Sequence, residues 1–247
     1  MSPTNAGKIT AAMIMGAGLG TRMRPLTDDR PKPLITVGGK TLIDHSIDRL
    51  AAAGVTLMVV NLHYKAEMLR THLGKRHDVK IVFSDETDKL LDTGGGVMKA
   101  MAHFGEEPFF VLNSDSIWIE HGTPALSAML AQWDETRMDG LLLLADMKTA
   151  LGYEGTGDFA RKSDGRLIRA RDAGGSDGIY AYPGVQIAHP RLFADAPEGA
   201  FSTNIMWDRA IAQGRLSGTV MDGTWLHVGT PEARDEAEAT LAALSAA

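Results

Sequence analysis

Short apolar runs alternate with amphipathic segments through the first 150 residues of the chain. Five of these runs predict buried strands: 9–15, 55–62, 79–83, 109–112 and 140–145. Apolar residues at helical spacing predict helices over 42–53, 66–73 and 124–133, and Gly54 and Gly74 mark the ends of the first two. Gly94-Gly95-Gly96 is expected to open another helix, which runs to about residue 103.

This alternation predicts an α/β fold of Rossmann-like type, with a mostly parallel sheet and helices on both faces. Ligands of such sheets bind beyond the carboxyl ends of the strands. Gly18, Asn61 and Asp115 each lie close to the end of a predicted strand. We therefore expect these three positions, distant in the sequence, to meet at one edge of the sheet.

The pattern changes after about residue 152. Residues 158–170 predict a hairpin that turns at Ser163-Asp164-Gly165, and 179–187 is a further extended segment. Helices are expected over 204–213 and 233–246. No linker rich in Pro, Ser or Gly separates the two halves, so we expect one domain with two parts, about 8–150 and about 151–247.

Composition narrows the class of protein. The chain has 247 residues, 44% of them hydrophobic, which is enough to bury a sizeable core. It has no apolar run near the length of a membrane span, and its polar N-terminus (Met1 to Lys8) carries no signal-like segment, so we predict a cytoplasmic protein without a membrane partner. It contains no cysteine, which excludes disulfides and thiolate metal sites. The net charge of −6 and the absence of a basic stripe argue against nucleic acid as a partner.

The basic residues gather where small phosphates would need them. In the segment from Gly16 to Arg24, glycines allow backbone N–H groups to approach phosphate oxygens, and Arg22 can add bidentate contacts to a pyrophosphate. Arg22 stands where a dinucleotide-binding turn needs its third glycine, and the Gly-Lys-Ser/Thr of a Walker loop is missing. Soon afterwards, Lys32 lies between two prolines, which restrict the backbone on both sides. The pattern predicts a triphosphate site.

At this point the sequence resembles a family, the sugar-phosphate nucleotidyltransferases. The resemblance rests on motifs spread over nearly the whole chain: Gly16-Ala17-Gly18-Leu19-Gly20-Thr21-Arg22-Met23-Arg24-Pro25-Leu26-Thr27, Pro31-Lys32-Pro33-Leu34, Val37-Gly38-Gly39-Lys40, Asp92-Thr93-Gly94-Gly95-Gly96, Asn113-Ser114-Asp115, Gly184-Val185, His189-Pro190 and Trp225-Leu226-His227-Val228-Gly229-Thr230-Pro231. Members of this family join a sugar 1-phosphate to a nucleoside triphosphate and release pyrophosphate. The resemblance implies the nucleotide-diphospho-sugar transferase fold, with the nucleotide bound by the first half and the sugar phosphate by the second.

Within the family, the short length and the Thr-Gly-Gly-Gly form are most similar to the bacterial N-acetylmuramate 1-phosphate uridylyltransferases of cell-wall recycling. This favours UTP and N-acetylmuramate 1-phosphate as substrates. One alternative is a mannose- or heptose-1-phosphate guanylyltransferase, in which Glu86 or Asp88 would accept a hydrogen bond from the guanine amino group. Another is a non-catalytic regulatory protein that binds nucleotide sugars. The sequence leaves a monomer and a small homo-oligomer equally open.

The resemblance assigns catalytic roles to three residues. Arg22 would hold the leaving pyrophosphate, Lys32 the α-phosphoryl group, and Asp115 a divalent metal ion, Mg²⁺ or alternatively Mn²⁺. The acceptor oxygen would attack the α-phosphorus directly, and because the acceptor is already an anion no general base is required.

Further residues are expected to bind the substrates. The phosphate loop supplies Gly16, Ala17, Gly18, Gly20 and Thr21; Asn61, Gly94, Gly95 and Asn113 serve the nucleoside or the sugar; Gly184, Asn204 and Asp158 serve the sugar. The acceptor phosphate needs another cation, for which Arg169, Arg171 and Lys148 are candidates.

The C-terminal motif departs from the family pattern. The family usually has Trp-x-Asp-x-Gly-Thr, whereas this chain has His227 at the third position. Imidazole is a poor ligand for Mg²⁺ and a better one for Mn²⁺, Co²⁺ or Zn²⁺. His227 would bind a metal directly, or contact a phosphate or a metal-bound water, or be structural while Asp222 or another carboxylate takes its place. We favour the second interpretation.

Overall fold

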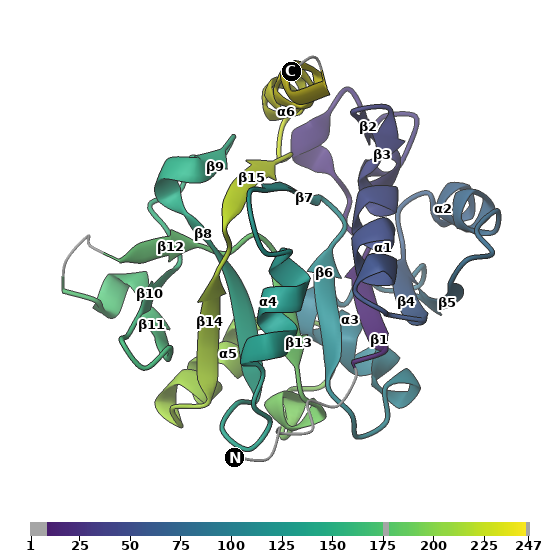
Figure 1. Cartoon of the computed structure of the whole chain (residues 1–247). Coiled ribbons are helices and arrows are strands. Elements are labelled where there is room, and N and C mark those ends of the chain that lie inside the picture. Colours follow the sequence, from purple (N-terminus) through teal and green to yellow (C-terminus); the bar gives the residue numbers. More distant parts are fainter. Residues whose placement is uncertain (1–8, 175–177, 246–247) are drawn as a thin grey trace.

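The first half of the chain builds the parallel part of a central sheet (Figure 1) in the computed structural model, which describes residues 9–174 and 178–245. Strand β1 (Ala11–Met15) lies between β4 (Leu57–Leu62) and β6 (Phe109–Asn113), and β5 (Lys80–Asp85) pairs with β4. All three pairings are parallel. The connecting helices are α1 (Leu42–Ala52), α2 (Ala66–Leu73) and α3 (Asp92–Ala100).

The second half extends the same sheet, mainly with antiparallel pairings. Strand β13 (Val185–Ala188) lies antiparallel between β6 and β8 (Gly140–Asp146). Strand β8 also pairs with β12 (Ile179–Ala181) and, in parallel, with β14 (Leu216–Val220). Beyond β12 lies the hairpin of β10 (Phe159–Arg161) and β11 (Leu167–Arg169). The result is a ten-stranded mixed sheet.

Two smaller sheets complete the described strands. One consists of β7 (Ser116–Glu120), β15 (Gly223–His227) and β9 (Ala150–Leu151), and the other of β2 (Thr36–Val37) and β3 (Lys40–Thr41). The C-terminal helix α6 (Pro231–Ser245) follows β15. Leu226 and Val228 form a buried cluster with Met23, Ile35 and other residues, so the end of β15 is packed against the loop that follows β1.

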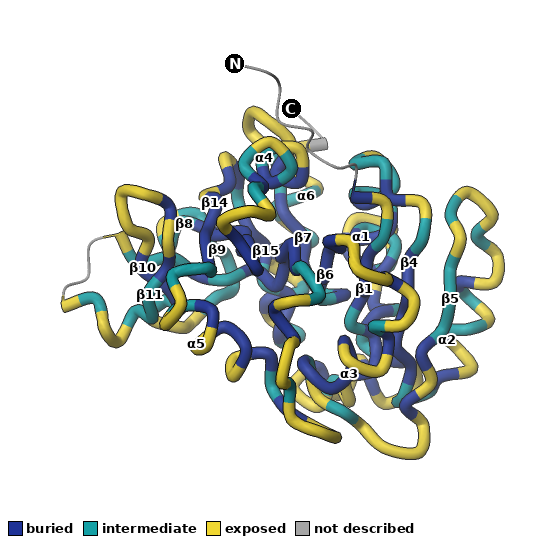
Figure 2. The backbone as a smooth tube through the Cα atoms, turned by 90° about the horizontal axis from the view of Figure 1, so that it is seen from below, coloured by how far each residue is buried: buried dark blue, intermediate teal, exposed yellow. Residues whose placement is uncertain are grey.

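Alternation along the strands divides the core between the two faces of the sheet. Ile14 and Val60 pack with α1, α2 and α4 (Ala125–Gln132), whereas their neighbours Met13 and Val59 pack with α3 and α5 (Asn204–Ala212). In Figure 1, α1 and α4 lie in front of the sheet, and α3 and α5 lie behind it. Figure 2 shows that buried positions concentrate in the central strands and exposed ones in the outer loops.

Helix α1 illustrates how local sequence sets an element. Leu42, Ile43, Ile47 and Leu50 are all fully buried, and they recur at the spacing of one helix face. The Thr41 hydroxyl accepts a hydrogen bond from the amide of Asp44 (3.3 Å), which caps the first turn. These features confirm the helix predicted from the apolar pattern.

The predicted α/β class, with helices on both faces of the sheet, is confirmed. The expected helices and strands are present within a few residues of their predicted bounds, except that the extended segment 179–187 is two strands, β12 and β13; the hairpin turns where expected. Strands β2, β3, β7, β9, β14 and β15 were not predicted. The polar N-terminal segment, residues 1–8, and the end of the last predicted helix lie outside the described residues. Within 9–174 and 178–245, no helix combines the length and apolarity that crossing a membrane requires.

Candidate active site

The loop after β1 is anchored from behind by buried polar groups. The Gly16 amide donates a hydrogen bond to Asn61 Oδ1 (2.7 Å), and Asn61 Nδ2 donates to Glu86 Oε1 (2.8 Å). Asn61 and Glu86 are 1% and 0% exposed. A Cβ on Gly16 would lie 2.9 Å from the Asn61 carbonyl oxygen, so only glycine fits this close approach. Asn61 therefore acts on the site by fixing the loop.

The backbone beyond Gly16 offers unused donors. Within the described part of the chain, the N–H groups of residues 17–20 donate no hydrogen bond. Gly20 has φ 64°, and Cβ at this position would lie 3.1 Å from Lys32 Cβ. A loop of free N–H groups is a suitable cradle for phosphate oxygens. Gly16, Ala17, Gly18, Gly20 and Thr21, the loop residues predicted to bind the substrate, all line one cavity, although the Gly16 N–H is already donated to Asn61.

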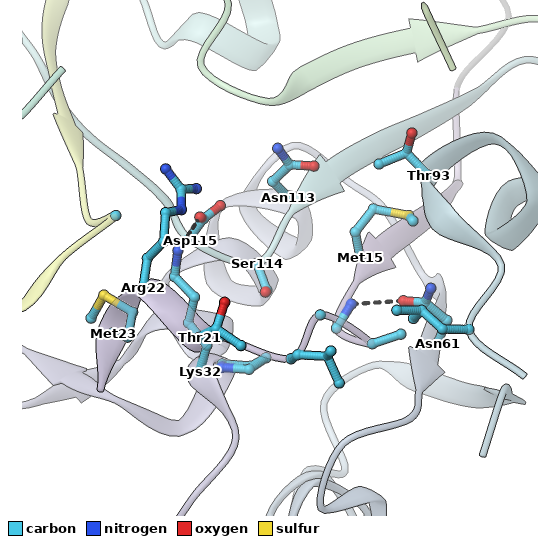
Figure 3. Close-up of a pocket in the computed structure, with 18 of the residues that line it drawn as sticks. Met15, Thr21, Arg22, Met23, Lys32, Asn61, Thr93, Asn113, Ser114 and Asp115 are labelled. Carbon is cyan, nitrogen blue, oxygen red and sulfur yellow. Dashed lines mark hydrogen bonds and ion pairs between the residues drawn. The ribbon is translucent and has the colours of Figure 1, made fainter. Parts of the chain in front are cut away.

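Lys32 and Asp115 meet at the floor of this cavity (Figure 3). Lys32 Nζ lies 2.6 Å from Asp115 Oδ2, and the two side chains are only 13% and 22% exposed. Burial by itself would raise the pKa of Asp115, but the Lys32 ammonium outweighs it and holds the pKa of this carboxyl below its usual range. Asp115 therefore remains an anion in the physiological range, as a metal ligand must be.

Arg22 is a cation without a protein partner. Neither a hydrogen bond nor an ion pair engages its guanidinium among the residues described, whereas Arg24 pairs with Asp28 (3.6 Å). Figure 3 shows Arg22 beside the Lys32–Asp115 pair. An exposed guanidinium that lines a cavity is available to bind an anion in a bidentate fashion.

Two cavities meet at these residues. The first, about 640 Å³, is lined by the loop, Lys32 and Asn61. The second, about 360 Å³, is lined by residues from β10, β13, α5 and β15, with their adjoining loops. Six residues line both cavities: Met15, Arg22, Asp92, Thr93, Asn113 and Asp115. A group bound in one cavity can thus meet a group bound in the other beside Arg22 and Asp115.

His227 lies on the wall of the second cavity, at the end of β15. It pairs with Ser116, the residue after Asp115. Its ring packs against Trp225 and Tyr153 (5.0 and 5.9 Å between centroids), and Nδ1 lies 3.1 Å from the carbonyl oxygen of Gly152. Because a carbonyl only accepts hydrogen bonds, this contact places the proton on Nδ1 and leaves Nε2 with a free lone pair.

Comparisons with known proteins agree with this geometry. A model of the nucleotidyl transferase family matches residues 11–154. Over 235 residues the chain is 50% identical to an N-acetylmuramate alpha-1-phosphate uridylyltransferase from Caulobacter vibrioides, covering 94% of this chain and 96% of that protein. The chain belongs to the nucleotidyl transferase family. A protein of the same name from Neisseria meningitidis is 33% identical over 92% of this chain and 96% of its own length.

The solved structures agree on the fold of this nucleotidyl transferase. A structure of UDP-glucose pyrophosphorylase complexed with UDP-glucose matches with a TM-score of 0.79, covering 96% of this chain and 99% of that one. The sequence identity is 16%, so this likeness concerns the fold alone. The resemblance noted in the sequence is confirmed.

The interpretation of Gly94 and Gly95 as nucleotide-binding is corrected by the structure of this nucleotidyl transferase. Both amides donate to the carbonyl oxygen of Phe201 (2.8 and 3.2 Å). A Cβ on Gly94 would overlap the Phe201 ring, and one on Gly95 would overlap the Gly199 carbonyl. Neither glycine is among the residues that line the two cavities. They seat the segment before α5 against α3, and Asp92 and Thr93 face the cavities instead.

Gly184 also lacks the position expected of a sugar contact. It lies outside the linings of both cavities and has φ 80°, and a Cβ there would overlap the side chain of Asn113. The backbone N–H of Asn113 donates a hydrogen bond to the Gly184 carbonyl oxygen (2.8 Å). Gly184 thus makes room for Asn113, which lines both cavities. Asn204 lines the second cavity, as predicted for a sugar contact.

The carboxylates considered as alternatives are excluded by their positions or by their hydrogen bonds. Asp222 comes immediately before β15, whereas His227 is the last residue of this strand. Because a strand rises about 3.3 Å per residue, the two residues are roughly 15 Å apart. Asp222 cannot substitute for His227. Glu86 Oε1 and Oε2 accept hydrogen bonds from Asn61 and from the Leu91 amide (3.1 Å), and the side chain is buried. Glu86 therefore cannot reach a guanine base, and Asp88 also lies outside the two linings.

The structure separates the three candidate cations of the second half. Arg169 lines the second cavity, whereas Lys148 and Arg171 line only a third cavity of about 750 Å³ beside it. Asp158, a predicted sugar contact, lines the second cavity. Its Oδ2 accepts hydrogen bonds from the Tyr153 hydroxyl (3.2 Å) and the Tyr182 backbone amide (2.8 Å). Sequence reasoning missed Gln186, which lines the same cavity and is 1% exposed, because nothing in the spacing of its short strand marks it.

Proposed function

We propose that this protein transfers a uridylyl group from UTP to N-acetylmuramate 1-phosphate and releases pyrophosphate. The observation that carries the proposal is the junction of two cavities at Arg22, Asn113 and Asp115. One cavity has the free amides and cations suited to a triphosphate, and the other has the polar and aromatic walls suited to a sugar. The two uridylyltransferases that align along nearly all of this chain support the choice of substrates.

The chemistry is a direct displacement. An oxygen of the acceptor phosphate attacks the α-phosphorus of UTP; a new P–O bond forms, and the bond to the bridging oxygen of the β-phosphate breaks. The negative charge leaves with pyrophosphate. Lys32 would neutralise the α-phosphoryl group, Arg22 and the free amides of the loop would hold the pyrophosphate, and Asn113 would orient the ribose or the sugar.

We further propose a division of labour along the chain. Residues of about 8–150 would bind the nucleotide, and residues of about 151–247 would bind the acceptor. The cytoplasm, where UTP is made, is the compartment that fits this reaction. The chain would act as a monomer or a small homo-oligomer.

The donor set fits a divalent metal ion with an incomplete protein shell. Among the described residues, no group of three or more His, Asp or Glu side chains converges as a metal site. Asp115 supplies a carboxylate and His227 a free Nε2, so most ligands would be phosphate oxygens and waters, as Mg²⁺ prefers. Such an ion would neutralise the negative charge of the phosphates while that charge shifts from the α-phosphoryl group to the leaving pyrophosphate. His227 would contact a metal-bound water or a phosphate.

Pyrophosphate release tests the proposal. The protein is assayed with UTP, GTP, CTP and dTTP against the 1-phosphates of N-acetylmuramate, N-acetylglucosamine, mannose and heptose. We expect the highest kcat/KM with UTP and N-acetylmuramate 1-phosphate. Turnover confined to GTP with mannose or heptose 1-phosphate would establish the guanylyltransferase instead. Binding of a nucleotide sugar without turnover of any pair would identify the regulatory alternative.

Arg22 provides the test of the phosphate assignment. We expect Arg22→Gln to lower kcat by about 10²–10³-fold, because a fixed charge on the leaving group is lost. Arg24→Gln is the matched control: this neighbouring arginine is paired with Asp28 and is absent from the cavity linings. Equal losses in the two variants would contradict the role given to Arg22.

A further inference from the structure

The second cavity has two distinct ends. At one end it shares Arg22 and Asp115 with the nucleotide cavity. At the other end it shares Asp158 and Arg169 with the third cavity, which has no lining residue in common with the nucleotide cavity. A sugar whose 1-phosphate lies beside Arg22 and Asp115 would therefore direct its far side toward Asp158 and Arg169.

Arg169 is held rigidly at this far end. Its Nε donates to Asp208 Oδ1 (2.7 Å) and its Nη2 to the carbonyl oxygen of Asn204 (3.1 Å). The guanidinium lies over the rings of Phe159 and Trp207 (4.8 and 5.7 Å to the centroids), and the side chain is only 13% exposed. Ordering this side chain costs little at the moment of binding, because the protein has already fixed it.

One donor nitrogen of Arg169 is left over. Nη1 has no partner within the described residues, although Nε and Nη2 are both satisfied. Among the arginines and lysines described, only Arg22 and Arg169 line the second cavity. The cavity thus has a cation at each end, and an acceptor whose sugar carries no charge of its own offers no anion to Arg169 at the far end.

The far end also contains an anion. This anion is the carboxylate of Asp158, whose Oδ2 accepts hydrogen bonds from the Tyr153 hydroxyl and the Tyr182 backbone amide. Burial and this carboxylate raise the pKa of Tyr153 to about 12, so the Tyr153 hydroxyl stays a neutral donor. Without the charge of Arg169, Asp158 would repel an acceptor that carries a second negative group.

We propose that Arg169 is the specificity-determining residue that recognises a carboxylate on the far side of the acceptor sugar, through Nη1. The inference rests on the proposed function, because the lactyl ether of N-acetylmuramate supplies such a carboxylate. N-acetylglucosamine 1-phosphate has the same ring and acetamido group without it. Arg169 therefore selects between two sugars that differ by this one anionic substituent.

The test compares these two acceptors in the full-length protein at saturating UTP. We expect Arg169→Met to lower kcat/KM for N-acetylmuramate 1-phosphate by about 10- to 100-fold, the usual range for one charge-assisted hydrogen bond, mainly through KM. For N-acetylglucosamine 1-phosphate the change should stay within about threefold. Arg169→Lys should retain part of the discrimination, and Arg169→Met combined with Asp158→Asn should recover part of it.

Arg171→Met is the matched control, since Arg171 lies nearby but lines only the third cavity. Thermal denaturation checks that each variant is folded, and Arg169→Lys carries the test if Arg169→Met is not. If Arg169→Met leaves the ratio of kcat/KM between the two acceptors unchanged, the inference is overturned while the proposed function stays intact. No turnover of N-acetylmuramate 1-phosphate by the wild-type protein would overturn both.

Discussion

The two ends of the candidate site are built in different ways. At the phosphate end, one continuous stretch from Gly16 to Lys32 supplies about half of the lining residues, and much of its binding capacity is in backbone N–H groups. At the acceptor end, the lining comes from side chains of several separate elements, among them Asp158 in the loop before β10, Gln186 on β13 and Asn204 on α5. Phosphates are common to all substrates of this family, so a local loop suffices for them. A sugar must be distinguished from other sugars, and this requires side chains brought together by the whole fold.

The difference has a kinetic consequence. In the proposed function, charges at the phosphate end would act where charge moves during the reaction, so their removal should lower kcat. Groups at the acceptor end would bind parts of the substrate that do not react, so their removal should raise KM for the acceptor. Substitutions at the two ends can therefore be ranked and separated.

The largest effect is expected at Lys32. Lys32→Met should lower kcat by about 10²–10³-fold, because a fixed charge at the α-phosphoryl group disappears. Lys40→Met is the control, since Lys40 pairs with Asp48 outside both cavities. Steady-state kinetics with both substrates varied measures the change. A loss confined to KM for the acceptor would show that the proposed contrast between the two ends is wrong.

The same variant tests the electrostatics of Asp115. In the wild-type protein its pKa is depressed, so the ionised form contributes stability above about pH 4, and this contribution is lost as the pH falls further. In Lys32→Met, the largest influence that opposes burial is lost, and only the weaker effects of His227 and a backbone hydrogen bond remain, so the pKa of Asp115 should rise. We expect the acid limb of the pH–kcat/KM profile to move to higher pH, and an unchanged limb would contradict this account.

A smaller effect is expected at Gly94, whose interpretation changed between sequence and structure. Gly94→Ala places a methyl group against the Phe201 ring and should destabilise the fold by about 1–3 kcal/mol. Since Ser202 and Thr203 line the second cavity, KM for the acceptor should rise more than KM for UTP. Thermal denaturation and kinetics measure both effects, and adding Phe201→Leu should recover part of the stability. A selective rise of KM for UTP would restore the role at the nucleotide.

Gly94 also illustrates how far the sequence is informative. Arg22, Lys32 and Asp115 could be proposed for one site because each belongs to a short motif whose parts are close in the chain and whose chemistry is specific, and all three line one cavity in the structure. A glycine, however, permits close approach to a ligand or to another part of the protein, and only the position of Phe201 distinguishes these cases. The fold class was predictable from alternating apolar runs. Strands β14 and β15 were not, since glycine, serine and threonine interrupt their apolar pattern.

Buried polar anchors were beyond the reach of sequence analysis for a related reason. Glu86 belongs to no motif, and the sequence offered it only as one of two possible acceptors for a guanine amino group. Its importance comes from Asn61, which Glu86 orients toward Gly16 from just beyond the end of β5. The same holds for Arg169, which the sequence offered only as one of three equivalent cations.

The smallest effect concerns His227, on the wall of the second cavity. His227→Asp exchanges a nitrogen for the hard oxygen that Mg²⁺ prefers, so the ratio of kcat/KM with Mg²⁺ to that with Mn²⁺ should rise several-fold. The variant loses the packing against Trp225 and the contact with Gly152, so its stability should fall by about 1 kcal/mol. Tyr153→Phe is the control, because it keeps a ring beside His227 and changes no potential metal ligand. If neither the rate nor the metal ratio changes, His227 has no part at the metal, and Asp115 is the one protein ligand left in the proposal.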